Sequence, residues 1–240
     1  MRLWIDTDVG SDPDDAIALL CAVAHPAIDL VAVSTVDDPT GARAQMARAL
    51  VGEVPVTIGA LLDPEGFADC DPDAVLAIGP LTNVARLVGA GHLPRRLAVM
   101  GGALAPICHR GTVCAVEHNF GGDPDAAMLV LERAADVLLC PLDVTVRTCV
   151  DDRDRQRLVE ADRRLGPILA GWEPRLCLHD PLALLALVDE SLVRAERRRL
   201  AVGPDGVVRV GEGTEHEVVV DVDVRATIAR VVALLELGAR

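Results

Sequence analysis

The sequence contains no lysine, and positive charge as a whole is scarce. All 23 basic side chains are arginines, against 37 aspartates and glutamates, which gives a formal net charge of −14. A surface with this balance repels both the phosphate backbone of nucleic acids and anionic lipid. We therefore predict that neither a nucleic-acid polymer nor a membrane is a partner.

Long apolar runs are also missing. No stretch approaches the roughly 18 uninterrupted apolar residues of a transmembrane helix. The chain enters strand-like sequence at Leu3, without the charged and apolar regions of a secretory signal. These absences predict a cytoplasmic protein.

The seven cysteines form no Cys-x-x-Cys pair. They stand at positions 21, 70, 108, 114, 140, 149 and 177, mostly inside apolar runs. An odd number of cysteines without paired spacing is typical of buried or free thiols in a reducing compartment. The sequence thus predicts neither a disulfide framework nor a zinc site, and no neighbouring pattern marks a catalytic cysteine.

What the sequence does contain is enough apolar material for one core. The chain has 240 residues, 51% of them hydrophobic, and a mean hydropathy of +0.33, which favours one domain over residues 1–240. Apolar runs predict strands at residues 3–5, 28–36, 56–59, 74–78, 97–100 and 137–142, with three more near 200–202, 206–210 and 217–220. Helices are predicted at residues 16–25, 41–51, 81–88, 125–134, 151–169, 179–188 and 222–237, and loops at 61–73 and 106–122. This alternation predicts an α/β fold with an open, Rossmann-like, mostly parallel central sheet flanked by helices.

Five aspartates follow the first predicted strand: Asp6, Asp8, Asp12, Asp14 and Asp15. Carboxylates this close repel one another, so a folded chain keeps them together only if they face water or surround a cation. One interpretation is a solvated loop with an aspartate as helix N-cap, and the other is a metal site. A set of purely oxygen donors would suit calcium or magnesium. An EF-hand is excluded, because the twelfth residue counted from Asp6 is Ile17, where that motif needs a glutamate.

Other polar segments follow later predicted strands. Residues 79–83, 101–102 and 143–145 come directly after strands, and parallel sheets bind ligands at the carboxyl ends of their strands. We therefore expect these segments to converge with the acidic loop.

Two histidine-containing motifs have two interpretations each. His179-Asp180-Pro181 is either part of a metal shell or simply an N-cap with proline at the first helical position. Glu117-His118-Asn119 either binds hydroxyl groups or forms a solvated loop. His25, His92 and His216 are predicted to be ordinary surface residues.

Five sequence blocks, taken together, resemble one family. They read Asp6-Thr7-Asp8-Val9-Gly10 with Asp14-Asp15-Ala16; residues 77–83, AIGPLTN; Met100-Gly101-Gly102; Glu117-His118-Asn119 with residues 123–127, DPDAA; and residues 179–183, HDPLA. In this order they resemble the inosine-uridine preferring nucleoside hydrolases, which are calcium enzymes that cleave the N-glycosidic bond of ribonucleosides. The resemblance implies the same fold, a nucleoside-like substrate, calcium as cofactor, and a homo-oligomer, either dimer or tetramer.

The resemblance also implies a role for each matching residue. Asp8 would bind calcium and act as the base for the attacking water. Asp15, the backbone carbonyl of Thr82, and Asp180 would complete the protein ligands of the ion. Asp14 would bind ribose hydroxyls, Glu117 and Asn119 would hold the sugar toward its 5′ end, and His179 would lie near the departing base.

The sequence departs from the family pattern at several positions. Ser11, Asp12 and Pro13 stand between the glycine and the aspartate pair, where the family has one residue. Asp38 matches a family ribose contact only loosely. Gly111 and His118 replace an asparagine and an aromatic residue. The chain is also shorter than family members between residues 59 and 74, where the family has a loop against the base. We expect an open pocket, a partner subunit that closes it, or a substrate other than a standard nucleoside.

We considered three alternative functions, of which the first is disfavoured. Asp6-x-Asp8 after a strand is similar to the nucleophile motif of haloacid dehalogenase-type phosphatases, but those enzymes need a lysine, which this chain lacks. A second is an N-ribosidase of a modified nucleoside or a nucleoside 5′-phosphate, with Arg110 and His118 toward the phosphate. The third is a ribose-binding protein without turnover.

Overall fold

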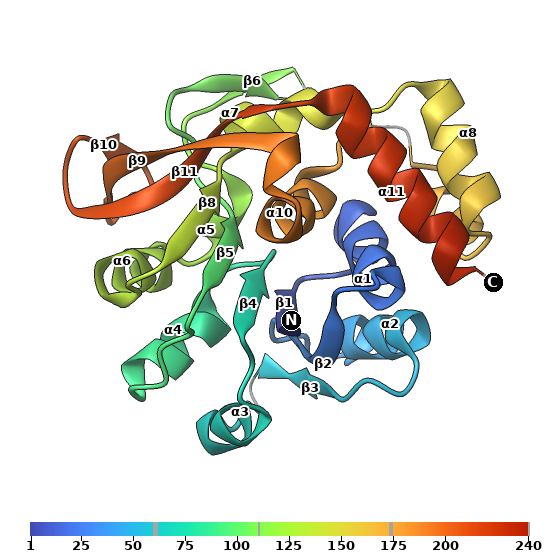
Figure 1. Cartoon of the computed structure of the whole chain (residues 1–240). Helices are drawn as coiled ribbons and strands as arrows, with labels where there is room; N and C mark the ends of the chain where they lie inside the picture. The colour runs from blue at the N-terminus through green and yellow to red at the C-terminus, as the bar shows by residue number, and fades with distance from the viewer. Residues whose placement is uncertain (60–61, 110, 173–174, 240) are drawn as a thin grey trace.

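A computed structural model describes residues 1–59, 62–109, 111–172 and 175–239, which build a nine-stranded sheet with helices on both faces (Figure 1). The strand order is β10-β9-β11-β8-β5-β4-β1-β2-β3. All pairings are parallel except those of β9, which runs antiparallel to β10 and β11. The strands of this sheet are β1 (Arg2–Thr7), β2 (Asp29–Thr35), β3 (Val56–Ile58), β4 (Ala74–Ala77), β5 (Leu97–Met100), β8 (Val137–Cys140), β9 (Val193–Val202), β10 (Val208–Val210) and β11 (Thr214–Val222). The predicted α/β fold with a mostly parallel sheet is confirmed.

The helices divide into two layers because successive side chains of a strand point to opposite faces. Leu3 and Ile5 of β1 pack into a core shared with helices α1, α2, α10 and α11, whereas Trp4 packs into a second core with α4 and α6. The helices are α1 (Asp14–Ala24), α2 (Ala42–Val51), α3 (Pro64–Cys70), α4 (Thr82–Gly89), α5 (His118–Gly122), α6 (Pro124–Arg133), α7 (Leu142–Thr145), α8 (Asp152–Ala161), α9 (Leu165–Leu169), α10 (His179–Val188) and α11 (Val224–Gly238). Among the described residues, no helix combines the length and hydrophobicity that a membrane span requires.

Three predicted segments differ from the structure. Within residues 61–73, predicted as a loop, α3 forms because the Asp63 carboxylate accepts the Glu65 amide and a proline opens the helix. Within residues 106–122, an antiparallel hairpin of β6 (Ile107–His109) and β7 (Thr112–Cys114) precedes α5. The predicted helix 151–169 is two helices, since Asp162 is extended at φ −141° and its carboxylate accepts the Arg164 amide.

Two of the cysteines are not free. Cys149 and Cys177, which the absence of paired spacing predicted to be thiols, are joined by a disulfide bond. Their backbones also lie against each other as an isolated antiparallel bridge. This prediction was wrong because the contact joins segments 28 residues apart in the sequence, a proximity that local spacing does not encode.

His216 was predicted to lie on the surface, and it is fully buried in β11. Its Nε2 lies 2.9 Å from the carbonyl oxygen of Leu131, which can only accept, so Nε2 carries the proton. Its Nδ1 has no hydrogen-bond partner within the described part of the chain. Burial, with the nearby Arg197 charge adding to it, lowers the pKa of His216.

This lowered pKa predicts a loss of stability in mild acid. The folded protein binds the His216 proton less readily than the unfolded chain, so the free energy of unfolding falls as pH drops below about 6.5. The slope from one proton is at most about 1.4 kcal/mol per pH unit. We expect His216→Gln, whose amide can still donate to Leu131, to lose this slope. Urea unfolding of both proteins with excess calcium at pH 7.5, 6.5 and 5.5 measures it, and equal slopes would contradict the prediction.

Candidate active site

A cavity of about 390 Å³ opens at the carboxyl ends of the parallel strands. Its wall includes Asp8 after β1, Ile78 after β4, Met100 at the end of β5, and Leu142 after β8. Six acidic side chains line it: Asp8, Asp12, Asp14, Asp15, Glu117 and Asp180. The strand ends next to the predicted segments therefore meet at the acidic loop, whereas residues 79–83, 101–102 and 143–145 themselves are not among the lining residues.

The acidic loop is not a solvated helix cap. β1 ends at Thr7, α1 begins at Asp14, and the N-cap of α1 is Pro13, which makes no side-chain cap. Asp8, Asp14 and Asp15 are all buried, with at most 6% of their surface exposed. The Thr7 hydroxyl donates to the Asp15 carboxylate and accepts the Val9 amide, which fixes the turn between strand and helix.

Three of these carboxylates form a cluster. Asp14 and Asp15 open α1, Asp180 lies in the first turn of α10, and one oxygen of each lies within 4.8 Å of the others. The Asp180 amide donates to Asp14 Oδ2 at 3.3 Å, which joins the two helix starts. The N-cap of α10 is Leu178, so the interpretation of Asp180 as an N-cap is wrong. Helix N-termini offset part of the negative charge gathered here.

The electrostatics of the cluster call for a cation. Burial, reinforced by the Asp12 and Asp8 charges, raises the pKa of Asp14 to about 7. Burial and the neighbouring carboxylates raise the pKa values of Asp15 and Asp180 well above the usual range. Within the described ranges no arginine forms an ion pair with these three carboxylates, and buried groups that offer only hard oxygen donors fit a calcium or magnesium ion.

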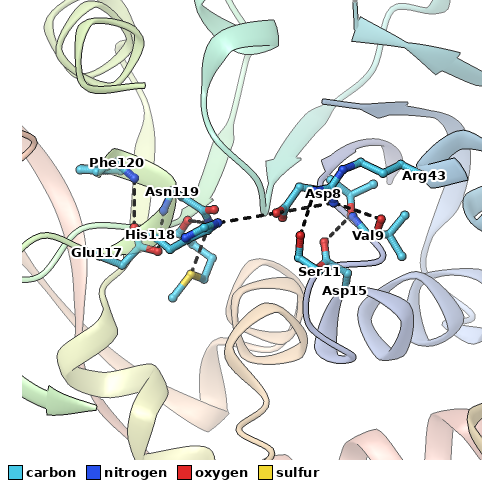
Figure 2. Close-up of polar contacts among 11 residues, drawn as sticks. Asp8, Val9, Ser11, Asp15, Arg43, Glu117, His118, Asn119 and Phe120 are labelled. Atoms are coloured by element: carbon cyan, nitrogen blue, oxygen red, sulfur yellow. Dashed lines mark hydrogen bonds and ion pairs between the residues drawn. The ribbon is translucent and has the colours of Figure 1, made fainter. Parts of the chain in front are cut away.

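Asp8 lies between Arg43 and His118, whose side chains approach its carboxylate (Figure 2). Arg43 Nη1 lies 3.8 Å and His118 Nε2 4.0 Å from Asp8 Oδ2. Arg43, from α2, also donates to Val9 O at 3.2 Å and to Ser11 Oγ at 2.9 Å, so it anchors the inserted loop. Burial raises the pKa of Asp8, although Arg43 and His118 act to lower it. No pattern in the sequence marks Arg43, which is one of two arginines in α2.

Glu117 and Asn119 are buried, which rules out a solvated loop for them. Glu117 is the N-cap of α5: its Oε1 accepts the Asn119 amide at 2.8 Å, and its Oε2 accepts the amides of Gly102 and Phe120. The side-chain amide nitrogen of Asn119 donates to Met100 O at 3.0 Å. This leaves the Asn119 side-chain oxygen as the group that can accept from a ligand hydroxyl. His118, between them, is 79% exposed.

His179 lines the same cavity and is 7% exposed. Its Nδ1 lies 2.8 Å from the Thr145 hydroxyl.

Three predicted site residues lie elsewhere or cannot be placed. Asp38 does not line the cavity. Its carboxylate accepts the Thr40 and Arg43 amides at the start of α2. The hydrogen bond from the Thr40 hydroxyl is the largest cause of the lowering of the Asp38 pKa to about 2, and the backbone amides add to it. Thr82 opens α4, where its hydroxyl donates to Asp123 at 2.6 Å, and it is not among the residues that line the cavity. Arg110 falls outside the described residues.

Comparisons of sequence and structure agree on one group of proteins. The sequence model of the inosine-uridine preferring nucleoside hydrolases matches residues 68–232. The chain is 26% identical to the non-specific ribonucleoside hydrolase RihC of Escherichia coli, over 93% of this chain and 89% of that protein. It is 28% identical to an uncharacterized protein of Schizosaccharomyces pombe, over 72% and 71%. The fold matches a plant nucleoside hydrolase with a TM-score of 0.81 at 21% identity, covering 98% of both chains. It also matches a purine-preferring ribonucleoside hydrolase from Gardnerella vaginalis with a TM-score of 0.74 at 20% identity, covering 98% and 99%.

Proposed function

Because the chain belongs to the inosine-uridine preferring nucleoside hydrolase family, we propose that it hydrolyses the N-glycosidic bond of a ribonucleoside or related N-riboside with the help of calcium. The products are the free base and ribose. The observation that carries the proposal is the cluster of buried carboxylates of Asp14, Asp15 and Asp180 with Asp8 in the same cavity. An acidic cavity of this kind suits a reaction whose sugar passes through a positively charged, oxocarbenium-like state.

The side chains that would hold the ion are those of Asp8, Asp15 and Asp180. The resemblance adds the backbone carbonyl of Thr82, although Thr82 is not among the residues that line the cavity. Asp14 belongs to the same oxygen cluster, although the resemblance assigns it to ribose hydroxyls. A bound calcium ion would supply positive charge that favours deprotonation of a nearby water. All the side-chain donors are carboxylates, which agrees with calcium and disagrees with zinc.

The chain's own residues would perform the remaining steps. Asp8 takes one proton from the attacking water, whose oxygen forms the new bond to C1′ as the bond from C1′ to the base nitrogen breaks. Asp14, Glu117 and Asn119 orient the sugar, and the buried negative charge around them stabilises the cationic ring. His179, which lines the cavity, assists the departing base by donating a hydrogen bond. The released base then takes a proton from solvent, to which Asp8 returns the one it received.

Recognition of the base is expected to be loose. None of the described residues between 62 and 73 lines the cavity, although the corresponding part of the family contacts the base. The six acidic side chains of the cavity disfavour a 5′-phosphate, since they would repel it. We therefore propose an uncharged nucleoside as the substrate, with a homo-oligomeric partner as one means of closing the pocket.

A panel of nucleosides and nucleoside 5′-monophosphates, incubated with and without chelator, tests the proposal. We expect ribose release from nucleosides, abolition by a chelator, and recovery on adding calcium. Release of ribose phosphate at an equal rate would favour the phosphorylated substrate instead. Binding of ribosides without any release would identify a binding protein without turnover.

A further inference from the structure

The environment of His179 is built by two threonines that the proposed reaction does not use. Thr145 ends α7 and is fully buried, as is Thr148 in the short 3-10 helix that follows, Val146–Thr148. Their side chains stand three positions apart and face the segment that carries His179. Buried hydroxyl groups are retained in a core at a cost unless they make hydrogen bonds, so their partners indicate what they do.

Thr145 makes the side-chain contact. Its Oγ1 lies 2.8 Å from His179 Nδ1, with both groups removed from solvent. The Thr145 backbone is fixed in turn, because its amide donates to Pro141 O at 3.1 Å, directly after β8. The hydroxyl is therefore held by the sheet rather than by a flexible loop.

Thr148 fixes the backbone on which His179 stands. Its Oγ1 reaches both Thr145 O at 2.7 Å and Leu178 O at 3.2 Å. The Leu178 amide donates back to Thr148 O at 3.2 Å. The residue before His179 and the residue that contacts its ring thus belong to one closed set of hydrogen bonds.

The geometry points to Thr145 as a positioning residue that holds the imidazole of His179 through Nδ1, in the wall of the cavity where the resemblance places the leaving base. A histidine ring with one nitrogen bonded to a rigid partner has its orientation set, as it is when such a partner orients a metal-ligating histidine. This inference rests on the proposed function for its consequence in catalysis. The contact itself does not depend on any activity.

Two substrates distinguish a positioning role of Thr145 from a purely structural role. A purine nucleoside needs help for its departing base, whereas p-nitrophenyl β-D-riboside releases a stable phenolate without such help. Loss of Thr145 should therefore slow only the first. We expect Thr145→Val to lower kcat for the purine nucleoside about 10- to 100-fold, with KM little changed, and to leave the nitrophenyl riboside within about 3-fold. Thr145→Ser, which keeps the hydroxyl, should restore most of the purine rate.

Thr227→Val is the matched control. Thr227 is equally buried, in α11, and its hydroxyl donates to Asp223 O at 2.8 Å, away from the cavity. We expect it to change the two rates by the same small factor. An equal loss on both substrates in Thr145→Val would assign Thr145 to the fold alone, and no loss on either would remove it from the reaction.

An activity-free measurement keeps this inference apart from the proposed function. In ¹⁵N-histidine-labelled protein at fixed pH, the His179 ring signals are assigned by their disappearance in His179→Gln. We expect the Nδ1 shift to move in Thr145→Val and to stay in place in Thr227→Val. An unmoved Nδ1 signal in Thr145→Val would overturn the inference. If wild type cleaved neither substrate with calcium while this signal moved, only the proposed function would fail.

Discussion

Asp8→Asn is expected to lower kcat for a nucleoside by about 10³-fold, the largest effect of any single substitution in the cavity. Asparagine keeps the size of the side chain and one oxygen for the ion, but it cannot take a proton from water. Calcium affinity should therefore weaken much less, by about 10-fold. Steady-state kinetics at saturating calcium and calorimetric titration of calcium measure the two quantities separately.

Asp12→Asn is the matched control for the loss of negative charge in Asp8→Asn. Asp12 lines the same cavity and lies in the same loop, so the variant removes the same unit of negative charge. We expect its kcat to fall by less than about 10-fold, because only the electrostatic field changes. If the two variants lost activity equally, Asp8 would act through its charge and not as a proton acceptor. Retention of more than a tenth of the activity in Asp8→Asn would exclude it as the base.

The metal-free protein is expected to become less stable as pH rises from 5 to 8. Burial raises the pKa values of Asp6 and Asp14 to about 7, and those of Asp15 and Asp180 rise as well. A carboxyl group with a raised folded-state pKa binds its proton more tightly in the folded than in the unfolded chain. It therefore contributes stability that is fully present below about pH 4 and is lost as pH rises through about 7. Most carboxylates give the opposite slope.

Calcium should reverse this dependence. Ion binding to the ionised cluster raises the free energy of unfolding by about 2.7 kcal/mol at 100 times the dissociation constant, which corresponds to a rise in Tm of about 5–10 °C. The rise should be largest at pH 8 and small at pH 5, where protons occupy the cluster. Differential scanning calorimetry with chelator or calcium at both pH values measures it. Asp180→Asn should lose most of the calcium-dependent rise, and an equal rise at both pH values would contradict the assignment of the cluster.

Parts of the fold with strong local signals were predictable to the residue. The run Leu97–Met100 ends at a glycine pair, and the apolar segment His179–Val188 begins at His-Asp-Pro; both have the predicted ends in the structure. Segments governed by single side-chain contacts were not predictable. The start of α3 depends on one carboxylate at Asp63, and the break between α8 and α9 depends on Asp162 binding its own neighbour.

The site divides in the same way. The acidic loop could be predicted as a site because so many carboxylates rarely occur in so short a stretch without a cation. The burial of Asp8, Asp14 and Asp15 agrees with that expectation. Arg43 and Thr145 have no such signal, since each acquires its importance only from a partner that tertiary folding brings close. Asp38 is a different case: a loose match of sequence assigned it to ribose, and in the structure its carboxylate accepts the Thr40 and Arg43 amides and does not line the cavity.

An ion bound where the starts of α1 and α10 meet would tie calcium binding to a late stage of folding. Asp14 and Asp180 lie 166 residues apart in the chain and meet through a single hydrogen bond. An ion held between them would behave as a reversible cross-link across that long loop, and closing such a loop restricts the unfolded chain. During synthesis the ion could not be held until the start of α10 had left the ribosome. Calcium binding would thus report that the segments carrying Asp14 and Asp180 have come together, well after synthesis of the acidic loop.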